Sequence, residues 1–212
     1  MSHGARRGVA APLAALICLV LALALAAPAG ATVSATTSVP GCGKQLFQQA
    51  FLRWSDPAWY VLTPSGTFES GASGWTQTGG AFVGSGNDPW KVSGPGSHAL
   101  HLPSGSSAIS APTCVSLLHP TLRFFARGFS TSTSDVLNVD ILYRDATGRI
   151  QSLRIGFVAP TGEWAPTSPK PLVTNVLSTL SGKRTYVAFR FTPQGATTWY
   201  IDDVYVDPWG KG

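Results

Sequence analysis

The nine residues from Trp199 to Asp207 constrain the fold more than any other stretch of this chain. They read Trp-Tyr-Ile-Asp-Asp-Val-Tyr-Val-Asp. Aromatic and β-branched residues in such a run favour a β-strand, which Pro208 would stop. Asp202 and Asp203 interrupt the apolar run, and a buried carboxylate is costly unless it is paired or binds a metal ion. The sequence therefore predicts a buried strand whose two adjacent acids need a partner.

The first 31 residues have the pattern of a secretory signal peptide. Arg6 and Arg7 form a basic start, residues 12–27 are apolar, and the small residues Ala29-Gly30-Ala31 suit cleavage after Ala31. The apolar stretch is shorter than the roughly 20 residues that a membrane span needs, and no later stretch is apolar enough. We expect a secreted protein, extracellular or associated with the cell envelope, whose mature chain has no membrane span.

Residues 32–212 have the length of one domain. Without the two arginines of the signal peptide, the formal net charge falls from +5 to about +3, and no Lys/Arg run is present. Such weak positive charge is not typical of nucleic-acid binding. We predict a flexible linker over 32–44 and one domain over 45–212. Its N-terminal arm (45–66) is rich in aromatic residues, so we expect it to pack on the domain, with a short helical turn over 56–60.

Two cysteines remain after cleavage of the signal peptide. Cys42 and Cys114 are 72 residues apart. In an exported chain an even pair indicates a disulfide, and only one intramolecular pairing is possible. Loop entropy alone gives such a crosslink roughly 4 kcal/mol. The disulfide would pin the N-terminal arm to the domain.

Short apolar runs separated by Gly-, Ser- and Pro-rich turns fill the rest of the chain. This punctuation is typical of an all-β sandwich or jelly roll. The predicted strands are 67–69, 80–83, 99–102, 107–110, 114–117, 121–127, 136–143, 149–158, 186–192 and 198–206. Residues 172–180 have a helical pattern, although a loop with one turn fits them equally well. We predict an all-β, two-sheet antiparallel β-sandwich (jelly roll) with a short N-terminal arm.

Alternation along these strands assigns their faces. The residues predicted to face the core are Leu137, Val139, Ile141, Tyr143, Gln151, Leu153, Ile155, Phe157, Val187, Phe189 and Phe191. The residues predicted to share the opposite, Arg-rich face are Arg123, Phe125, Arg127, Asn138, Asp140, Arg144, Ser152, Arg154, Tyr186 and Arg190. Arginines bind carboxylates through two hydrogen bonds, so this face would suit an acidic polysaccharide, with an aromatic ring stacked on a sugar. A solvated face with cross-strand charge pairs, or a face covered by the arm, explains the same residues.

The aromatic residues add two further candidates for sugar binding. Trp75 and Trp199 suit the core, whereas Trp90 and Trp164 lie in predicted loops, where an exposed indole can stack on a sugar ring. A structural role is the commoner one for such tryptophans. No catalytic motif is present. A lyase-like site, with Tyr186 as base and Arg154 and Arg190 neutralising a uronate, can be assembled from the same face, but no sequence pattern selects it.

Several short motifs resemble a known family. Phe68-Glu69-Ser70-Gly71, Gly74-Trp75, Gly96-Ser97 and the stretch 199–204 are similar to the ends of family-4/9-type carbohydrate-binding modules, which are galactose-binding-like jelly rolls. More of the chain is similar to a group of uncharacterised secreted bacterial proteins, through Leu-Arg-Phe-Phe-Ala-Arg (122–127), Ala-Phe-Arg-Phe-Thr-Pro (188–193) and the C-terminal Ile-Asp-Asp-Val-Tyr-Val-Asp-Pro. The second resemblance implies no activity.

The first resemblance implies a structural calcium ion. In that family a glutamate after the first-strand Phe and an aspartate of the last strand help to hold the ion, and these positions match Glu69 and Asp202 or Asp203. Calcium prefers six to eight oxygen ligands. Alternatively, one aspartate accepts backbone N–H groups and the other pairs with an arginine.

We therefore expect a non-catalytic binding module for extracellular or cell-wall polysaccharide. The alternatives are a jelly-roll polysaccharide lyase and a protein-interaction or envelope-associated domain.

Overall fold

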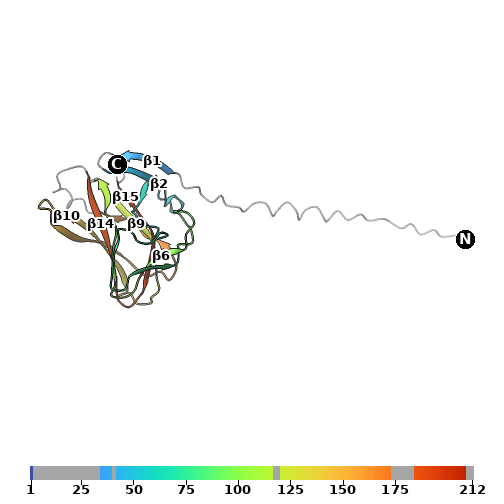
Figure 1. The fold of residues 1–212 in the computed structure, drawn as a ribbon. Helices are drawn as coiled ribbons and strands as arrows, with labels where there is room; N and C mark the ends of the chain where they lie inside the picture. Colours follow the sequence, from blue (N-terminus) through green and yellow to red (C-terminus); the bar gives the residue numbers. More distant parts are fainter. Residues whose placement is uncertain (2–33, 40–41, 117–119, 173–183, 209–212) are drawn as a thin grey trace. The chain divides into compact units, whose positions relative to one another are not determined.

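The computed structural model describes Met1 and residues 34–39, 42–116, 120–172 and 184–208 (Figure 1). These residues form two antiparallel β-sheets, as predicted, with one short 3₁₀ turn among the described segments. None of the described helices is long and apolar enough to cross a membrane. The predicted signal peptide and nearly all of the stretch 172–180 lie outside the described residues.

Sheet I is built around the stretch that the sequence singled out. Its strands, in spatial order, are β1 (Ser34–Val39), β2 (Gly43–Gln48), β3 (Tyr60–Leu62), β15 (Trp199–Asp207), β6 (His98–Leu102) and β5 (Phe82–Ser85). β9 (Thr121–Gly128) also pairs with β15, and the short β12 (Ala165–Pro166) and β13 (Lys170–Pro171) pair with β9. β15 therefore bonds to β3 and β6 on one side and to β9 on the other.

Sheet II holds the strands with the clearest alternation. Their spatial order is β11 (Ile150–Val158), β10 (Val136–Arg144), β14 (Arg184–Gln194), β7 (Ser107–Ile109) and β4 (Thr76–Thr78). β8 (Thr113–Ser116) pairs with the first residues of β14.

The core lies between the two sheets. Sheet II contributes Val139, Phe189 and Phe191 to it, and sheet I contributes Phe124 and Trp199, all fully buried. The predicted core faces of β10 and β14 are confirmed, and so is the burial of Trp75 and Trp199. A buried aromatic side chain removes more apolar surface from water than a buried side chain of any other type, so these rings contribute most to the stability of the sandwich.

β11 departs from the predicted alternation at both ends. A β-bulge places Arg154 and Ile155 together opposite Asp140, and one extra residue turns the side chains beyond it over. Phe157 therefore points outward and is 59% exposed, not buried as predicted. Gln151 is also exposed, because its amide turns to the hairpin loop and donates to Asp145 (2.7 Å).

The predicted linker and the N-terminal arm both differ from the sequence prediction. The stretch expected to be a flexible linker instead contains β1 and the start of β2, which form a hairpin. The short helical turn covers Leu52–Trp54, not residues 56–60. The predicted strand at 67–69 is a turn, in which Phe68 has a positive φ of 59°. The predicted disulfide between Cys42 and Cys114 is present, with its Cα atoms 5.6 Å apart.

Candidate functional site

The outer face of sheet I is covered by the N-terminal arm. Phe51 and Tyr60 of the arm pack on Phe125 of β9 and Tyr205 of β15, and all four rings are buried. Phe51 stacks on Phe125 at 5.5 Å between ring centroids. The predicted packing of the arm is therefore confirmed, and it removes Arg123 and Phe125 of the predicted Arg-rich face from solvent.

Arg123 lies beneath this cover. Its Nη1 donates to Oδ2 of Asp56 (2.7 Å), its Nε donates to the carbonyl of Thr167 (2.8 Å), and its guanidinium lies 4.1 Å from the centroid of the Phe51 ring. Burial acts against the charge of Asp56, but hydrogen bonds from Tyr60, Ala58 and Arg123 outweigh it, and the pKa of Asp56 is lowered. Arg123 is thus a buried structural cation.

Arg127 also belongs to sheet I. Its Nε donates to the carbonyl of Gly162 (3.2 Å), and its guanidinium lies 5.9 Å from the Tyr200 ring. Tyr200 belongs to a row of rings on this face: Phe82, His101, Tyr200 and Trp164. The expectation that Arg123 and Arg127 share one face with Arg154 and Arg190 is wrong, because β9 hydrogen-bonds to β15 and not to the strands of sheet II.

The two tryptophans proposed as sugar platforms also lie on the sheet I side. Trp90 packs edge-on against Trp54 (5.2 Å between centroids) and lies 5.3 Å from Phe125. Trp164 lies 6.5 Å from Tyr200. Both indoles are half-buried, and neither lies near Arg154 or Arg190 in the sheet order.

The outer face of sheet II carries a charged cluster centred on Asp140. Arg190 donates to Oδ2 of Asp140 through Nε (3.0 Å) and Nη2 (2.9 Å), and Nε of Arg154 donates to Oδ1. Nη1 of Arg154 also bonds to Oδ1 of Asn138, and Nη2 of Arg190 bonds to Oγ of Ser152 (2.8 Å). We call Asp140, Arg154 and Arg190 the arginine clamp.

The three side chains of the arginine clamp differ in their exposure to solvent. The Asp140 side chain is 6% exposed, whereas those of Arg154 and Arg190 are 51% and 36% exposed. Burial disfavours the Asp140 carboxylate, but the two arginines outweigh this and hold its pKa below its ordinary value. One carboxylate therefore orients two cations, and each guanidinium keeps at least two N–H groups outside these hydrogen bonds.

The neighbours of the clamp are aromatic and polar. Phe157 lies opposite Asn138 across the β10–β11 pair and is exposed. Tyr186, on the same face of β14 as Arg190, is 57% exposed. Sequence reasoning brought Asp140, Arg154, Tyr186 and Arg190 to one face, but it missed Phe157. Gly156, a glycine inside a strand, was the available signal of a bulge.

The two acids of β15 lie at a second site, inside sheet I. A bulge interrupts the pairing of β15 with β9 after Asp202, and Asp203 there adopts a φ of 49°. Asp202 accepts hydrogen bonds from the backbone N–H groups of Asp88 (3.2 Å) and Asp203 (2.8 Å). Asp203 accepts from the N–H (3.0 Å) and Oγ (2.5 Å) of Ser93.

Asp88 completes a buried acidic cluster with Asp202 and Asp203. One carboxylate oxygen from each lies within 4.8 Å of the others, and all three residues are at least 99% buried. Burial raises the pKa of each carboxyl, and repulsion from Asp203 raises that of Asp202 further. Oδ2 of Asp88 has no hydrogen-bond partner among the described residues. An orphaned carboxylate oxygen beside two more carboxylates fits an oxygen-binding cation such as calcium.

Glu69 does not join this cluster. Its carboxylate accepts hydrogen bonds from the backbone N–H groups of Ser97 and His98, both at 2.9 Å. Its predicted place beside Asp202 and Asp203 is taken by Asp88, which the sequence analysis did not single out. The predicted alternative is confirmed in one half, because Asp202 accepts backbone N–H groups. Its other half is wrong for the described contacts, because Asp203 bonds to Ser93 and not to an arginine.

Comparisons with known proteins gave distant structural similarities. No protein-family model matches the chain, and no curated protein is similar to it. The chain is similar to part of a Clostridium thermocellum xylanase chain that comprises CBM22-1 and GH10 modules (15% identity, TM-score 0.48); the match covers 71% of this chain but only 28% of that one.

Two shorter structures are covered almost completely. One is the C-terminal family 22 module of Clostridium thermocellum Xyn10B (17% identity, 69% of this chain, 92% of that chain, TM-score 0.46). The other is TmCBM61 in complex with β-1,4-galactotriose (18% identity, 67% and 94%, TM-score 0.38). The structures named here do not confirm the resemblance to family 4/9 modules. At these identities and TM-scores, the similarities assign neither a family nor a ligand to the chain.

Proposed function

We propose that this chain is a secreted, non-catalytic carbohydrate-binding module, and that the outer face of sheet II binds an acidic polysaccharide of the cell wall or extracellular space. The observation that carries the proposal is the arginine clamp. Asp140 is buried and fixes the orientation of Arg154 and Arg190, while both guanidinium groups remain accessible. A clamp that is oriented before binding loses little conformational entropy when a ligand arrives.

The chemistry of the clamp suits a uronate. A planar guanidinium binds a carboxylate through two parallel, charge-assisted hydrogen bonds. The exposed ring of Phe157 offers an apolar surface for one face of a sugar, and the side chains of Asn138 and Ser152 add polar groups beside the arginines. A neutral glycan would use the same hydrogen-bond donors without the charge, so we expect weaker binding of neutral than of acidic polymers.

The test is retention in native affinity gels that contain neutral or acidic polysaccharides. We expect polygalacturonate to retard the protein, and Arg154→Ala or Arg190→Ala to lose about tenfold in affinity. Arg53→Ala removes an exposed arginine from the arm side and serves as the matched control. Equal retardation of all four proteins would contradict the proposal, and unsaturated uronide products in the gel would support a lyase instead.

We also propose that Asp88, Asp202 and Asp203 hold a structural calcium ion. The cluster links β15 to the loop that contains Asp88 and Ser93, so a bound cation would stabilise the centre of sheet I. At a calcium concentration 100-fold above Kd, binding adds about 2.7 kcal/mol. For a domain of this size that shifts Tm by about 5–10 °C.

Thermal unfolding with calcium and with chelator tests this site. Asp88→Asn should abolish the calcium-dependent rise in Tm, whereas Glu69→Gln should keep it, because Glu69 bonds to the 97–98 backbone and not to the cluster. An unchanged Tm at saturating calcium would contradict the site. If only Glu69→Gln loses the calcium-dependent rise in Tm, the result would support the ligand set that the family resemblance implies.

A further inference from the structure

The connection between β5 and β6 joins the buried acidic cluster to the N-terminal arm. Its residues 88–93, which we call the cluster loop, are hydrogen-bonded to β15 at both ends. The backbone N–H of Asp88 donates to Oδ2 of Asp202 (3.2 Å), and the N–H of Ser93 donates to Oδ2 of Asp203 (3.0 Å). Oγ of Ser93 donates to the same carboxylate (2.5 Å). The position of the cluster loop therefore depends on the two acids of β15.

A turn inside the cluster loop orients Trp90. Oδ1 of Asp88 accepts hydrogen bonds from the backbone N–H groups of Trp90 (2.8 Å) and Lys91 (3.0 Å). Lys91 has a φ of 52°, which is uncommon for a residue other than glycine, so the turn relies on these hydrogen bonds. Oδ2 of Asp88 has no hydrogen-bond partner among the described residues, which leaves it for a cation. One side chain thus belongs to the acidic cluster and also fixes the position of Trp90.

Trp90 makes the contact between the cluster loop and the arm. Its indole packs edge-on against Trp54, which belongs to the 3₁₀ turn of the arm, at 5.2 Å between ring centroids. Both indoles also lie 5.3 Å from the ring of Phe125 on β9. Trp90 and Trp54 are half-buried, so each ring covers part of the other. Withdrawal of Trp90 would uncover Trp54 and Phe125 and weaken the packing of the arm on sheet I.

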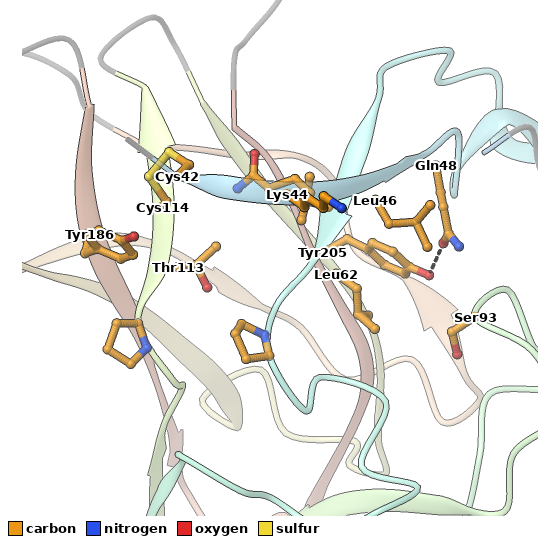
Figure 2. Close-up of a pocket in the computed structure, with 14 residues that line it drawn as sticks. Cys42, Lys44, Leu46, Gln48, Leu62, Ser93, Thr113, Cys114, Tyr186 and Tyr205 are labelled. Carbon is orange, nitrogen blue, oxygen red and sulfur yellow. Dashed lines mark hydrogen bonds between the residues drawn. A yellow bond between two sulfur atoms is a disulfide. The ribbon is translucent and has the colours of Figure 1, made fainter. Parts of the chain in front are cut away.

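The arm also contacts β15 directly, two residues after Asp203. The hydroxyl of Tyr205 donates to Oε1 of Gln48 at the end of β2 (2.8 Å; Figure 2). Gln48 and Tyr205 line a pocket of about 450 Å³, and Ser93 of the cluster loop lines the same pocket. The arm, β15 and the cluster loop therefore meet at this second point as well.

We infer that a calcium ion bound by the acidic cluster stabilises the closed position of the arm on sheet I. The inference rests on the proposed calcium site. One carboxylate oxygen from each of the three buried acids lies within 4.8 Å of the others, and without a cation their charges repel one another. Asp202 and Asp203 belong to β15 at the centre of sheet I, whereas Asp88 belongs to a loop, so the repulsion displaces Asp88. Trp90 moves with Asp88 and loses its contact with Trp54.

Limited trypsin digestion of the full chain, expressed for export, tests the coupling. Arg53 is exposed in the 3₁₀ turn of the arm, beside Trp54, so cleavage after Arg53 measures opening of the arm. We expect saturating calcium to slow this cleavage about tenfold relative to chelator. Arg149 is exposed in the β10–β11 hairpin of sheet II, and cleavage after it should proceed at the same rate in both conditions. This internal control also corrects for any effect of calcium on trypsin.

Three variants separate the aromatic contact from the ion site. Trp90→Ala retains the backbone N–H that bonds to Asp88, so it should keep a calcium-dependent rise in Tm. Cleavage after Arg53 in this variant should be fast with calcium and with chelator. Asp88→Asn should lose both the rise in Tm and the protection of Arg53. Phe82→Ala is the matched control and should behave as wild type, because its ring packs on His101 of β6 and not on the arm.

The outcomes separate this inference from the proposed calcium site. A Tm that rises with calcium, together with an unchanged rate of cleavage after Arg53, would overturn the coupling and leave the site intact. Equal protection at Arg53 and Arg149 would also overturn it, because calcium would then act on the whole domain. Full calcium protection of Arg53 in Trp90→Ala would show that Trp90 does not transmit the effect. A Tm that does not respond to calcium overturns the site, and this inference with it.

Discussion

The outer faces of the two sheets carry similar side chains in opposite environments. On sheet I, Arg123 pairs with Asp56 beneath the aromatic side chains of the arm, and both side chains are nearly buried. On sheet II, Arg154 and Arg190 share Asp140 at a surface that exposes both arginines. An Arg–Asp contact is therefore part of a second small core on one face and part of an accessible surface on the other.

The difference shows what decides the role of such a pair. Alternation along a strand determines only that a side chain points away from the core, whereas cover from another segment determines whether it meets water. In this chain the cover of sheet I is the arm, which the Cys42–Cys114 disulfide anchors at one end. The described arm residues contribute nothing comparable over the arginine clamp of sheet II.

The largest effect is expected from breaking the covered pair. Asp56→Ala leaves the buried Arg123 without its counter-charge, and removing one partner of a buried ion pair costs about 3–5 kcal/mol. Tyr60 also loses the acceptor for its hydroxyl (2.7 Å). Urea unfolding of the variant and wild type measures this difference. A loss below about 1 kcal/mol would mean that the arm does not seal Arg123 from water.

The second effect concerns the anchor of the cover. Replacing Cys42 and Cys114 together by serine removes a crosslink across 72 residues and should cost about 2–4 kcal/mol. The loss should be accompanied by exposure of the arm aromatics, which near-ultraviolet circular dichroism would detect. Unchanged stability in the double variant would show that the aromatic contacts of Phe51 and Tyr60 alone hold the arm in place.

The third effect tests the covered Arg123–Asp56 pair by pH. The pKa of Asp56 is lowered from 3.8, so its ionisation stabilises the fold fully above about pH 4 and is lost as the pH falls through the folded-state value. Urea unfolding between pH 5 and 2 should show a shallower acid-induced loss of stability in Asp56→Asn than in wild type. Parallel curves would indicate that other carboxylates dominate acid unfolding.

A feature of the fold was predictable when it depends on local sequence pattern, and not when it depends on pairing between distant strands. The long strands β10, β11 and β14 of sheet II, the core faces of β10 and β14 and the disulfide depend on local alternation and on cysteine pairing, and the sequence predicted them, whereas it missed the short strand β4. Phe157 was misplaced because one extra residue at the β11 bulge reverses every later side chain. That bulge depends on the register with β10, which local pattern does not contain.

The sequence analysis assumed that the strands of the Arg-rich face are neighbours, and its candidate site was right only where this holds in the structure. Asp140, Arg154 and Arg190 met that condition. Arg123 did not, because assigning β9 to sheet I required knowledge of its pairing with β15. Asp88 was missed for a similar reason, since 114 residues separate it from Asp202, and its loop offers no periodic pattern that would direct it to β15.

The smallest effect on stability is expected at the clamp, where the effect on binding should be largest. Asp140→Asn removes the counter-charge of Arg154 and Arg190, but both guanidinium groups reach solvent, so we expect a loss of about 1 kcal/mol or less. Affinity for polygalacturonate should nevertheless fall about tenfold, because the arginines lose the carboxylate that orients them. Unfolding and affinity-gel retardation should both be measured for Asp140→Asn and Asp56→Asn. We expect Asp140→Asn to lose mainly affinity and Asp56→Asn to lose mainly stability. If Asp140→Asn unfolds as readily as Asp56→Asn, both pairs are structural, and the two faces differ only in how much of the arginine side chains they expose.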